Sequence, residues 1–318
     1  MIAAKVLGRI PNFADPTAAR PVLVVRLGDS VVPLGTDRIQ TLNAYRGTNM
    51  EDRVRLQIDD HGVADVCLVR GDKMNALDME MFEALAATIE QLKTETRARV
   101  VVLHGEGKAF CAGLDMGRFA KMKDGSAGGT RDLRARTHGI ANSAQYVGLG
   151  WREIPVPVIA AVHGVAFGGG LQVALGADIR LLAPDAQMSV MEVKWGLVPD
   201  MAGVVLLRGL LRDDVARELC FTGRVVAADE AVALGLATRC CADPLAEARA
   251  MAAAIAQRSP SAVRAAKRLL NQAQRTLDGS AAELLQAESD EQAAIIGGPN
   301  QVEAVRANLE GRAPKFID

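Results

Sequence analysis

The chain has 318 residues, enough for one large domain or two of moderate size. Its 37 Lys and Arg residues nearly balance its 38 Asp and Glu residues, which gives a formal net charge of −1. This balance argues against a bulk electrostatic partner such as duplex nucleic acid or an anionic membrane surface. No apolar run reaches the roughly 20 residues of a transmembrane helix, so no membrane partner is expected.

Cysteine and histidine usage gives no sign of a metal site or a disulfide framework. The five cysteines, at positions 67, 111, 220, 240 and 241, form no CxxC pair, and the four histidines have no ligand spacing. We expect no metal and a cytoplasmic location, because unpaired cysteines are typical of a reducing compartment. His104 and His163 each precede a glycine at a predicted strand end, where we expect packing.

The first 49 residues differ from the rest of the chain. They contain prolines at positions 11, 16, 21 and 33 and show no sustained helical period. The prolines also interrupt any amphipathic helix of the kind that mitochondrial targeting segments form. We expect residues 1–49 to be a weakly ordered extension, and two origins stay open: a native segment or translation from an upstream start site. The mass of the protein from its native source separates the two.

From residue 54 onward the pattern is typical of a layered α/β core. Short apolar runs rich in β-branched residues, as in buried strands, occur at 66–69, 100–103 and 158–162. Between the first two runs, apolar residues recur at every third or fourth position from Phe82 to Leu92, which predicts a helix. Asp78 is placed to cap that helix at its N-terminus.

Two further segments complete the predicted organisation. Residues 117–130 contain glycines and lysines without a strong period, which predicts a loop, either a plain surface connection or a lid over a ligand. The chain is strongly helical and rich in alanine from 213 to 310. We therefore predict an α/β core over 50–245 and a helical C-terminal region over 246–318.

Two glycine-containing turns follow predicted strands and open predicted helices. They are "GEGKAFCAGLDM" at 105–116 and "HGVAFGGGLQVALGAD" at 163–178, and neither has dinucleotide-binding or P-loop spacing. Glycine and alanine let backbone N–H groups approach a ligand, and a helix start adds the positive end of its dipole. Two such turns facing each other would form an oxyanion hole for an enolate. Tight packing joints are the alternative interpretation.

A third stretch, "DAQMSVMEVKWGLVPDMAG" at 185–203, holds two carboxylates eight residues apart, Glu192 and Asp200. Glu192 stands among valines and a methionine, and an apolar setting raises the pKa of a carboxyl group towards the range useful for proton transfer. The alternative is a solvated carboxylate on a strand edge.

Taken in this order, the stretches resemble the crotonase superfamily, the enoyl-CoA hydratase and isomerase family. "GDKMNALDMEM" resembles its strand-exit motif, "GKAFCAGLDM" and "AAVHGVAFGGGLQVALGADIR" its two oxyanion-hole turns, "QMSVMEVKWGLVPDMAG" its catalytic segment and "GRAPKF" its basic-aromatic tail. The resemblance covers about 54–318. It implies an α/β fold, a spiral of ββα units with a helical C-terminal trimerisation region, and a homo-trimer or homo-hexamer. It also implies an acyl-CoA thioester substrate and no separate cofactor.

The resemblance also implies roles for individual residues. The oxyanion-hole donors would be the N–H groups of Ala112 and Gly169. Glu192 and Asp200 would carry the proton. The implied substrate-binding residues are Lys73, Gly113, Leu114, Asp115, Gln172 and Lys315. Asp115 is expected to cap the following helix rather than to take part in chemistry, and Cys111 is expected to be a small packing residue.

Gln172 decides between reactions that the resemblance allows. Family hydratases resemble one another in using two glutamates to activate water, and this chain has Gln172 at the position of the first. An amide holds water but does not usefully move its proton. We therefore favour double-bond isomerisation of an enoyl-CoA or dienoyl-CoA by Glu192 and Asp200. The alternatives are a hydratase in which Gln172 only positions water, a non-catalytic acyl-CoA-binding protein, and thioester hydrolysis or decarboxylation.

Overall fold

The computed structural model describes residues 23–27, 30–34, 52–117, 132–258, 260–275 and 281–312. The chain divides into two compact units, Met1–Thr48 and Asn49–Asp318. The described part of the first unit is an antiparallel hairpin of β1 (Leu23–Leu27) and β2 (Ser30–Leu34). Most of residues 1–49 lie outside the described ranges, so their weak order stays a prediction.

A six-stranded sheet forms the centre of the second unit, in the order β11-β8-β6-β5-β4-β3. Only β3 and β4 pair antiparallel within it, and every other neighbouring pair is parallel. The strands are β3 (Val54–Ile58), β4 (Val63–Leu68), β5 (Val100–Gly105), β6 (Val158–Val162), β8 (Ile179–Leu182) and β11 (Arg239–Cys240). The three apolar runs predicted as strands correspond to β4, β5 and β6, which confirms the α/β class.

A smaller sheet of three strands carries the second glycine turn. Its order is β10-β9-β7, with β7 (Val165–Phe167), β9 (Gln187–Ser189) and β10 (Val226–Ala227). β7 and β9 are parallel, and Phe167 is the partner of Ser189. The carboxyl ends of the two strands therefore lie side by side. One leads into helix α5 (Gly169–Gly176) and the other into the short helix η3 (Glu192–Trp195).

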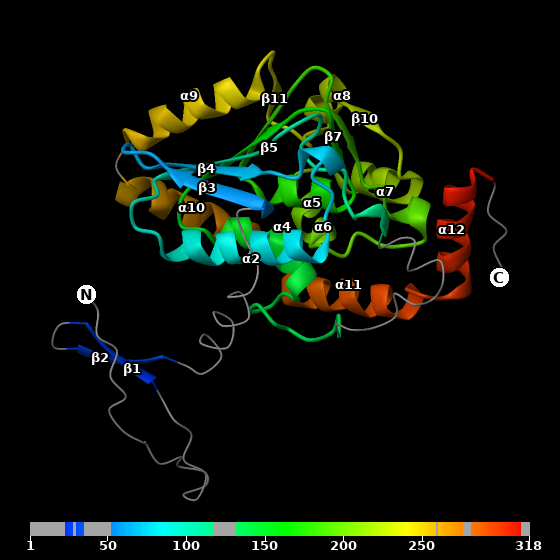
Figure 1. Cartoon of the computed structure of the whole chain (residues 1–318), viewed down its shortest axis with the longest axis horizontal. Coiled ribbons are helices and arrows are strands. Elements are labelled where there is room, and N and C mark those ends of the chain that lie inside the picture. Colours follow the sequence, from blue (N-terminus) through cyan, green and yellow to red (C-terminus); the bar gives the residue numbers. More distant parts are fainter. Residues whose placement is uncertain are drawn as a thin grey trace, which may run out of the picture. The chain divides into compact units, whose positions relative to one another are not determined.

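Helices cover both faces of the large sheet (Figure 1). α9 (Pro244–Ala256) packs its alanines on one face, against valines and other aliphatic residues of β5, β6 and β8. The other side holds α2 (Met79–Thr94), α4 (Ser143–Glu153) and α5, which pack on one another. α2 is the helix predicted from the apolar period, and the Asp78 side chain accepts the Met81 N–H at 2.8 Å, so the predicted cap is confirmed.

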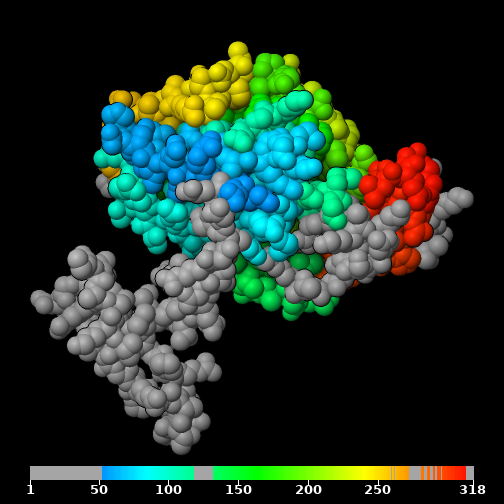
Figure 2. Space-filling view, in the orientation of Figure 1, coloured from blue at the N-terminus to red at the C-terminus, as the bar shows by residue number. Residues whose placement is uncertain are grey.

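The rest of the second unit is mostly helical. Its helices are η2 (Gly71–Lys73), α6 (Gly203–Arg208), α7 (Asp213–Thr222), α8 (Ala228–Leu234), α10 (Pro260–Arg275), α11 (Ala281–Ile295) and α12 (Pro299–Glu310). α12, red in Figure 2, packs on η3, where Leu197 and Val305 form a small buried cluster. Its Asn308 side chain donates to the Lys194 carbonyl at 2.6 Å. In the part of the chain that the structure describes, no helix is long and apolar enough to span a bilayer.

Candidate active site

The first glycine turn is hydrogen-bonded to the strand that leads into the second. Cys111 N–H donates to the Val165 carbonyl at 3.0 Å, and Phe167 N–H donates back to the Cys111 carbonyl at 3.1 Å. Beyond this contact, Gly113 has a positive φ of 88°. A Cβ at Gly113 would lie 2.6 Å from the Phe167 oxygen and 3.6 Å from the Gly169 nitrogen. Only glycine allows this approach, which brings the two turns together.

The N–H groups of these turns differ in what they bind. Ala112 N–H donates to the Met74 carbonyl at 2.9 Å. This bond leaves the Ala112 N–H unavailable to a ligand, which corrects the role expected for that residue. Leu114, two residues further along, lies opposite Leu77 in an isolated parallel bridge. In this bridge Leu77 N–H donates to the Gly113 carbonyl, and Asp115 N–H donates to the Leu77 carbonyl.

Two N–H groups, those of Leu114 and Gly169, lie near the point where the turns approach each other. In a parallel bridge the central residue directs its own N–H away from the opposite strand, so the Leu114 amide points away from Leu77. Gly169 is the first residue of α5, and the N–H groups of a first turn have no partner within the helix. Neither Leu114 N–H nor Gly169 N–H donates a hydrogen bond to any residue within the described ranges. The pair is therefore available to an oxygen atom of a ligand.

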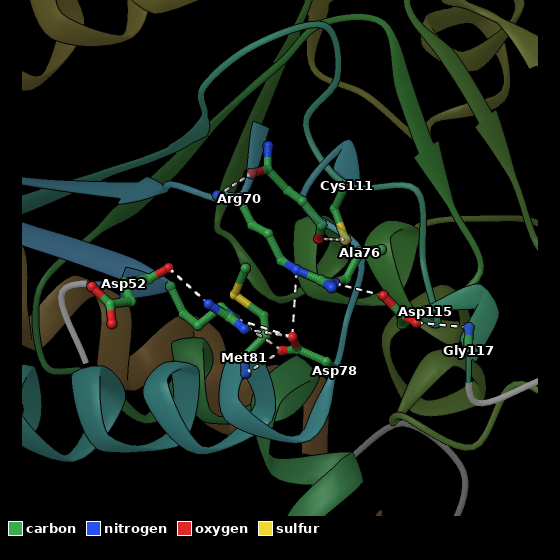
Figure 3. Close-up of polar contacts among 10 residues, drawn as sticks. Asp52, Arg70, Ala76, Asp78, Met81, Cys111, Asp115 and Gly117 are labelled. Atoms are coloured by element: carbon green, nitrogen blue, oxygen red, sulfur yellow. Dashed lines mark hydrogen bonds and ion pairs between the residues drawn. The ribbon is translucent and has the colours of Figure 1, made fainter. Parts of the chain in front are cut away.

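Ion pairs hold the first turn in place, and Figure 3 shows Arg70 between Asp78 and Asp115. Arg70 follows β4, and its guanidinium donates to the Ala76 carbonyl at 2.9 Å and to the Asp115 carboxylate at 2.7 Å. Asp78 also accepts from Arg53 at 2.9 Å. Asp115 accepts the Gly117 N–H at 2.7 Å, the hydrogen bond of an N-cap, and the residues after 117 that it was expected to cap as a helix lie outside the described ranges.

The sequence motifs did not single out Arg70 or Asn75. The buried Asn75 side chain donates to the carbonyls of Glu106 and Ala109, and its φ of 54° is left-handed. Asparagine tolerates that conformation better than most residues, so the "MNAL" turn held a signal for Asn75. Nothing in the local pattern pointed to Arg70, because its partner Asp115 is 45 positions away.

The second turn carries a buried amide against a buried carboxyl group. Gln172 Nε2 on α5 donates to Glu192 Oε1 at 2.6 Å. The oxygen of the same side-chain amide, Gln172 Oε1, accepts two backbone N–H groups, from Met201 at 2.8 Å and from Gly203 at 2.7 Å. These two donors require an acceptor, which fixes the amide so that its nitrogen faces Glu192. The Glu192 carboxyl group also lies against Gly168, where a Cβ would be 3.3 Å from Oε1.

Glu192 is only 7% exposed and stands in η3, so it is not a solvated carboxylate on a strand edge. Burial, together with the negative charge of Asp200, raises the pKa of Glu192 to about 8, and the hydrogen bonds from its own backbone N–H and from Gln172 oppose this rise. Asp200 itself is partly buried, in the turn that precedes Met201. Glu192 Oε2 is buried and accepts no hydrogen bond from the residues that the structure describes.

The remaining predicted substrate-binding residues are spread around the first turn. Lys73 is exposed on η2. Burial alone would raise the pKa of Asp115, but the Arg70 hydrogen bond and the Lys73 charge hold it below its usual range. The Leu114 side chain packs against the cluster of Leu197 and Val305 beside α12, as the Trp195 side chain does. Lys315 and almost all of the predicted 117–130 loop lie outside the described residues.

The Cys111 thiol has the packing role expected of it. Cys111 is fully buried, its thiol donates to the Asn75 carbonyl at 3.1 Å, and burial raises its pKa to about 12. A thiol in this state is a packing group and not a nucleophile. Among the described residues, no group of three or more His, Cys, Asp or Glu side chains could hold a metal ion.

Comparison with known proteins decides the family. The model of the enoyl-CoA hydratase/isomerase family matches residues 59–318. The chain belongs to the enoyl-CoA hydratase/isomerase family. It is therefore an enzyme of the crotonase type, with the α/β fold that the sequence motifs implied.

Relatives and solved structures agree with this assignment. A Bacillus subtilis protein described as a probable enoyl-CoA hydratase is 30% identical over 255 residues, 79% of this chain and 94% of the relative. Mouse mitochondrial methylglutaconyl-CoA hydratase is 33% identical over 214 residues, 66% of this chain and 65% of the relative. A Mycobacterium paratuberculosis enoyl-CoA hydratase/isomerase superposes with a TM-score of 0.71 at 30% identity, over 82% of this chain and 99% of that structure.

Proposed function

We propose that this enzyme moves a carbon–carbon double bond along the acyl chain of a CoA thioester. The observation that carries the proposal is the Gln172–Glu192 pair, in which an amide and not a second carboxyl group touches the buried glutamate. An amide neither removes nor delivers a proton at neutral pH, so Glu192 is the proton carrier at this point of the site. Asp200, near enough to act on the charge of Glu192, is the proposed partner acid.

The two available N–H groups supply the electrostatic part of the mechanism. In the proposal, Leu114 and Gly169 bind the thioester oxygen, in place of the Ala112 and Gly169 pair that the sequence implied. When a proton leaves the acyl chain, negative charge collects on that oxygen as an enolate. Each preorganised donor of this kind is worth about 3–4 kcal/mol of barrier lowering.

Glu192 supplies the proton transfer. Its carboxylate removes a proton from one carbon of the acyl chain, and the resulting dienolate spreads its charge onto the thioester oxygen. The neutral carboxyl group, or Asp200 as partner, then returns a proton to a carbon further along the chain. A pKa of about 8 suits both steps near neutral pH. The formula of the substrate does not change.

Hydration is the second candidate, because the relatives from Bacillus subtilis and mouse carry the name of hydratases. It requires one proton to leave water and another to reach the α-carbon. The Gln172 carbonyl oxygen already accepts two backbone N–H groups, so Gln172 can offer a water only its remaining N–H. In this alternative Glu192 alone would handle both protons.

The same proposal covers the rest of the ligand and the assembly. We propose a CoA thioester whose polar arm follows Gly113, Leu114 and Asp115, with Lys73 and Lys315 as contacts for its phosphates or adenine. The helical C-terminal region is proposed to assemble a homo-trimer or homo-hexamer. No separate cofactor is proposed.

The test is an incubation of the purified protein in heavy water with a trans-2-enoyl-CoA, a 3-enoyl-CoA and a 3,5-dienoyl-CoA, read by mass. A product that gains deuterium and keeps its formula supports isomerisation. A product that gains one water overturns it in favour of hydration, and binding without any chemistry favours a non-catalytic acyl-CoA-binding protein. Free CoA or carbon dioxide would reveal thioester hydrolysis or decarboxylation. Glu192→Gln should abolish turnover, whereas Glu218→Gln on the exposed face of α7 should not.

A further inference from the structure

The Gln172 amide lies at the meeting point of three segments. It stands on α5, it accepts hydrogen bonds from the turn before α6, and it donates to Glu192 at the start of η3. The side chain is 2% exposed, so these bonds have no competition from bulk water. A side chain with this many directed bonds holds its neighbours in one arrangement.

The turn before α6 is shaped to receive the Gln172 oxygen. Ala202 has a positive φ of 69°, which costs free energy for a residue other than glycine. That conformation aims the N–H groups on both sides, Met201 and Gly203, at the same oxygen. A Cβ at Gly203 would lie 2.6 Å from Gln172 Oε1, so glycine is needed there. Successive N–H groups of this kind form a small concavity that favours negative charge.

The carboxyl group of Glu192 is consequently held by one oxygen. Oε1 accepts the Gln172 amide, while Oε2 has no hydrogen-bond donor among the described residues. Both oxygens lie within about 4 Å of a Cβ built at Gly168, the residue before the Gly169 N–H. The two oxygens are therefore chemically distinct, although they belong to one carboxyl group.

We propose that Gln172 is a positioning residue that locks the Glu192 carboxyl group through Oε1, so that Oε2 is the atom that exchanges the proton with the acyl chain. This inference rests on the proposed function of Glu192. It assigns Gln172 a role other than holding water. It also explains why an amide suits the site, since an amide accepts from the turn and donates to Glu192 at the same time.

The replacement Gln172→Glu separates these two tasks. A carboxylate oxygen still accepts the N–H groups of Met201 and Gly203, so the turn stays satisfied and the variant is expected to fold. The donor to Glu192 is lost, and a second negative group takes its place. Two carboxyl groups in contact cannot both ionise near neutral pH, so the one beside the N–H concavity keeps the charge and Glu192 keeps the proton.

The experiment compares the wild type, Gln172→Glu and Gln172→Met, with Gln187→Glu at the exposed first residue of β9 as a control for the added charge. Steady-state kinetics with the 3-enoyl-CoA give kcat and KM. Infrared difference spectra, referenced to Glu192→Gln, follow the protonation of Glu192 with pH. We expect Gln172→Met to lower kcat at least roughly tenfold with KM nearly unchanged, because a misplaced base costs rate and not binding. Gln172→Glu should move the Glu192 titration to higher pH.

The outcomes separate this inference from the function on which it rests. If wild-type protein isomerises and Glu192→Gln does not, while both Gln172 variants keep kcat within twofold and an unchanged Glu192 titration, the positioning role is overturned. A second outcome is that neither the wild type nor any variant shows isomerase activity, while the Glu192 titration moves in Gln172→Glu and not in Gln187→Glu. In that case the positioning role of Gln172 stands and the proposed reaction is wrong. A Glu192 titration that Gln187→Glu moves as far as Gln172→Glu does also overturns the positioning role of Gln172.

Discussion

Arg70 and Asp115 form an ion pair at 2.7 Å that joins the end of β4 to the residue after Leu114. Both side chains are largely buried. The same guanidinium also donates to the Ala76 carbonyl, and its Nε lies 3.4 Å from Asp78 Oδ2. The position of the Leu114 N–H therefore depends on a side chain that stands outside the site.

Replacing Arg70 by Met should lower kcat/KM about tenfold or more, because the Leu114 amide loses its support. It should also lower the free energy of unfolding by roughly 1–3 kcal/mol, since the Asp115 carboxylate keeps only the Gly117 N–H. Kinetics and urea unfolding measure the two effects. Arg97→Met is the matched control, because that arginine pairs with Glu95 on the surface and such pairs contribute little. Equal losses in both variants would contradict the prediction.

The pH dependence of turnover should report the Glu192 carboxyl group. Only its ionised form removes a proton, and burial raises its pKa to about 8. The value of kcat/KM should therefore rise with pH and level off above about 8. A profile that is flat between pH 6 and 9 would show that another group is the base.

The same burial should make the folded protein less stable as Glu192 ionises. A group whose pKa is raised by folding contributes stability at low pH that is lost as the pH rises through the folded value. The melting temperature of the wild type relative to Glu192→Gln should fall between about pH 4.5 and 8, the usual and the folded pKa. Melting curves across this range measure the difference, and parallel curves for the two proteins would contradict it.

His104 should make a second pH-dependent contribution to the stability of the folded protein. Burial alone would lower its pKa, but the hydrogen bond at 2.8 Å to Asp65, which also binds Arg249 of α9, and the contact with Cys67 raise it to about 9. The stability from the protonated form is complete below about 6.5 and is lost as the pH rises through 9. The melting temperature of the wild type relative to His104→Gln should therefore fall between pH 6 and 10. The exposed His61→Gln should behave as the wild type.

The sequence predicted what depends on local pattern and missed what depends on distant partners. The strands around β4 to β6, the α2 helix and the Asp78 cap follow from apolar period and capping chemistry, which neighbouring residues determine. His104 was expected only to pack, because its partner Asp65 comes from the adjacent strand.

The N–H group proposed as the first oxyanion donor illustrates the same limit within one turn. The motif located the proposed donor to within two residues. The choice between Ala112 and Leu114, however, depends on which of their N–H groups donates a hydrogen bond to the Met74 carbonyl. That pairing is made by a segment almost forty positions earlier, so spacing within the motif cannot reveal it. Gln172 was identified from its place in the motif, whereas its orientation follows from the N–H groups of Met201 and Gly203.

Gly113 offers the sharpest test of how the two turns depend on each other. An alanine there needs a φ of 88° and puts its Cβ 2.6 Å from the Phe167 oxygen, so the turn must move away from Gly169. Strain of this kind costs of order 1–3 kcal/mol, and the Leu114 and Gly169 N–H groups would move apart. Gly113→Ala should therefore lose both stability and turnover. Gly139→Ala is the control, because Gly139 has a similar φ of 63° but a Cβ there meets nothing within 4 Å. If Gly139→Ala loses some stability and keeps its turnover while Gly113→Ala loses both, the close approach of the turns, and not backbone strain alone, is what the reaction requires.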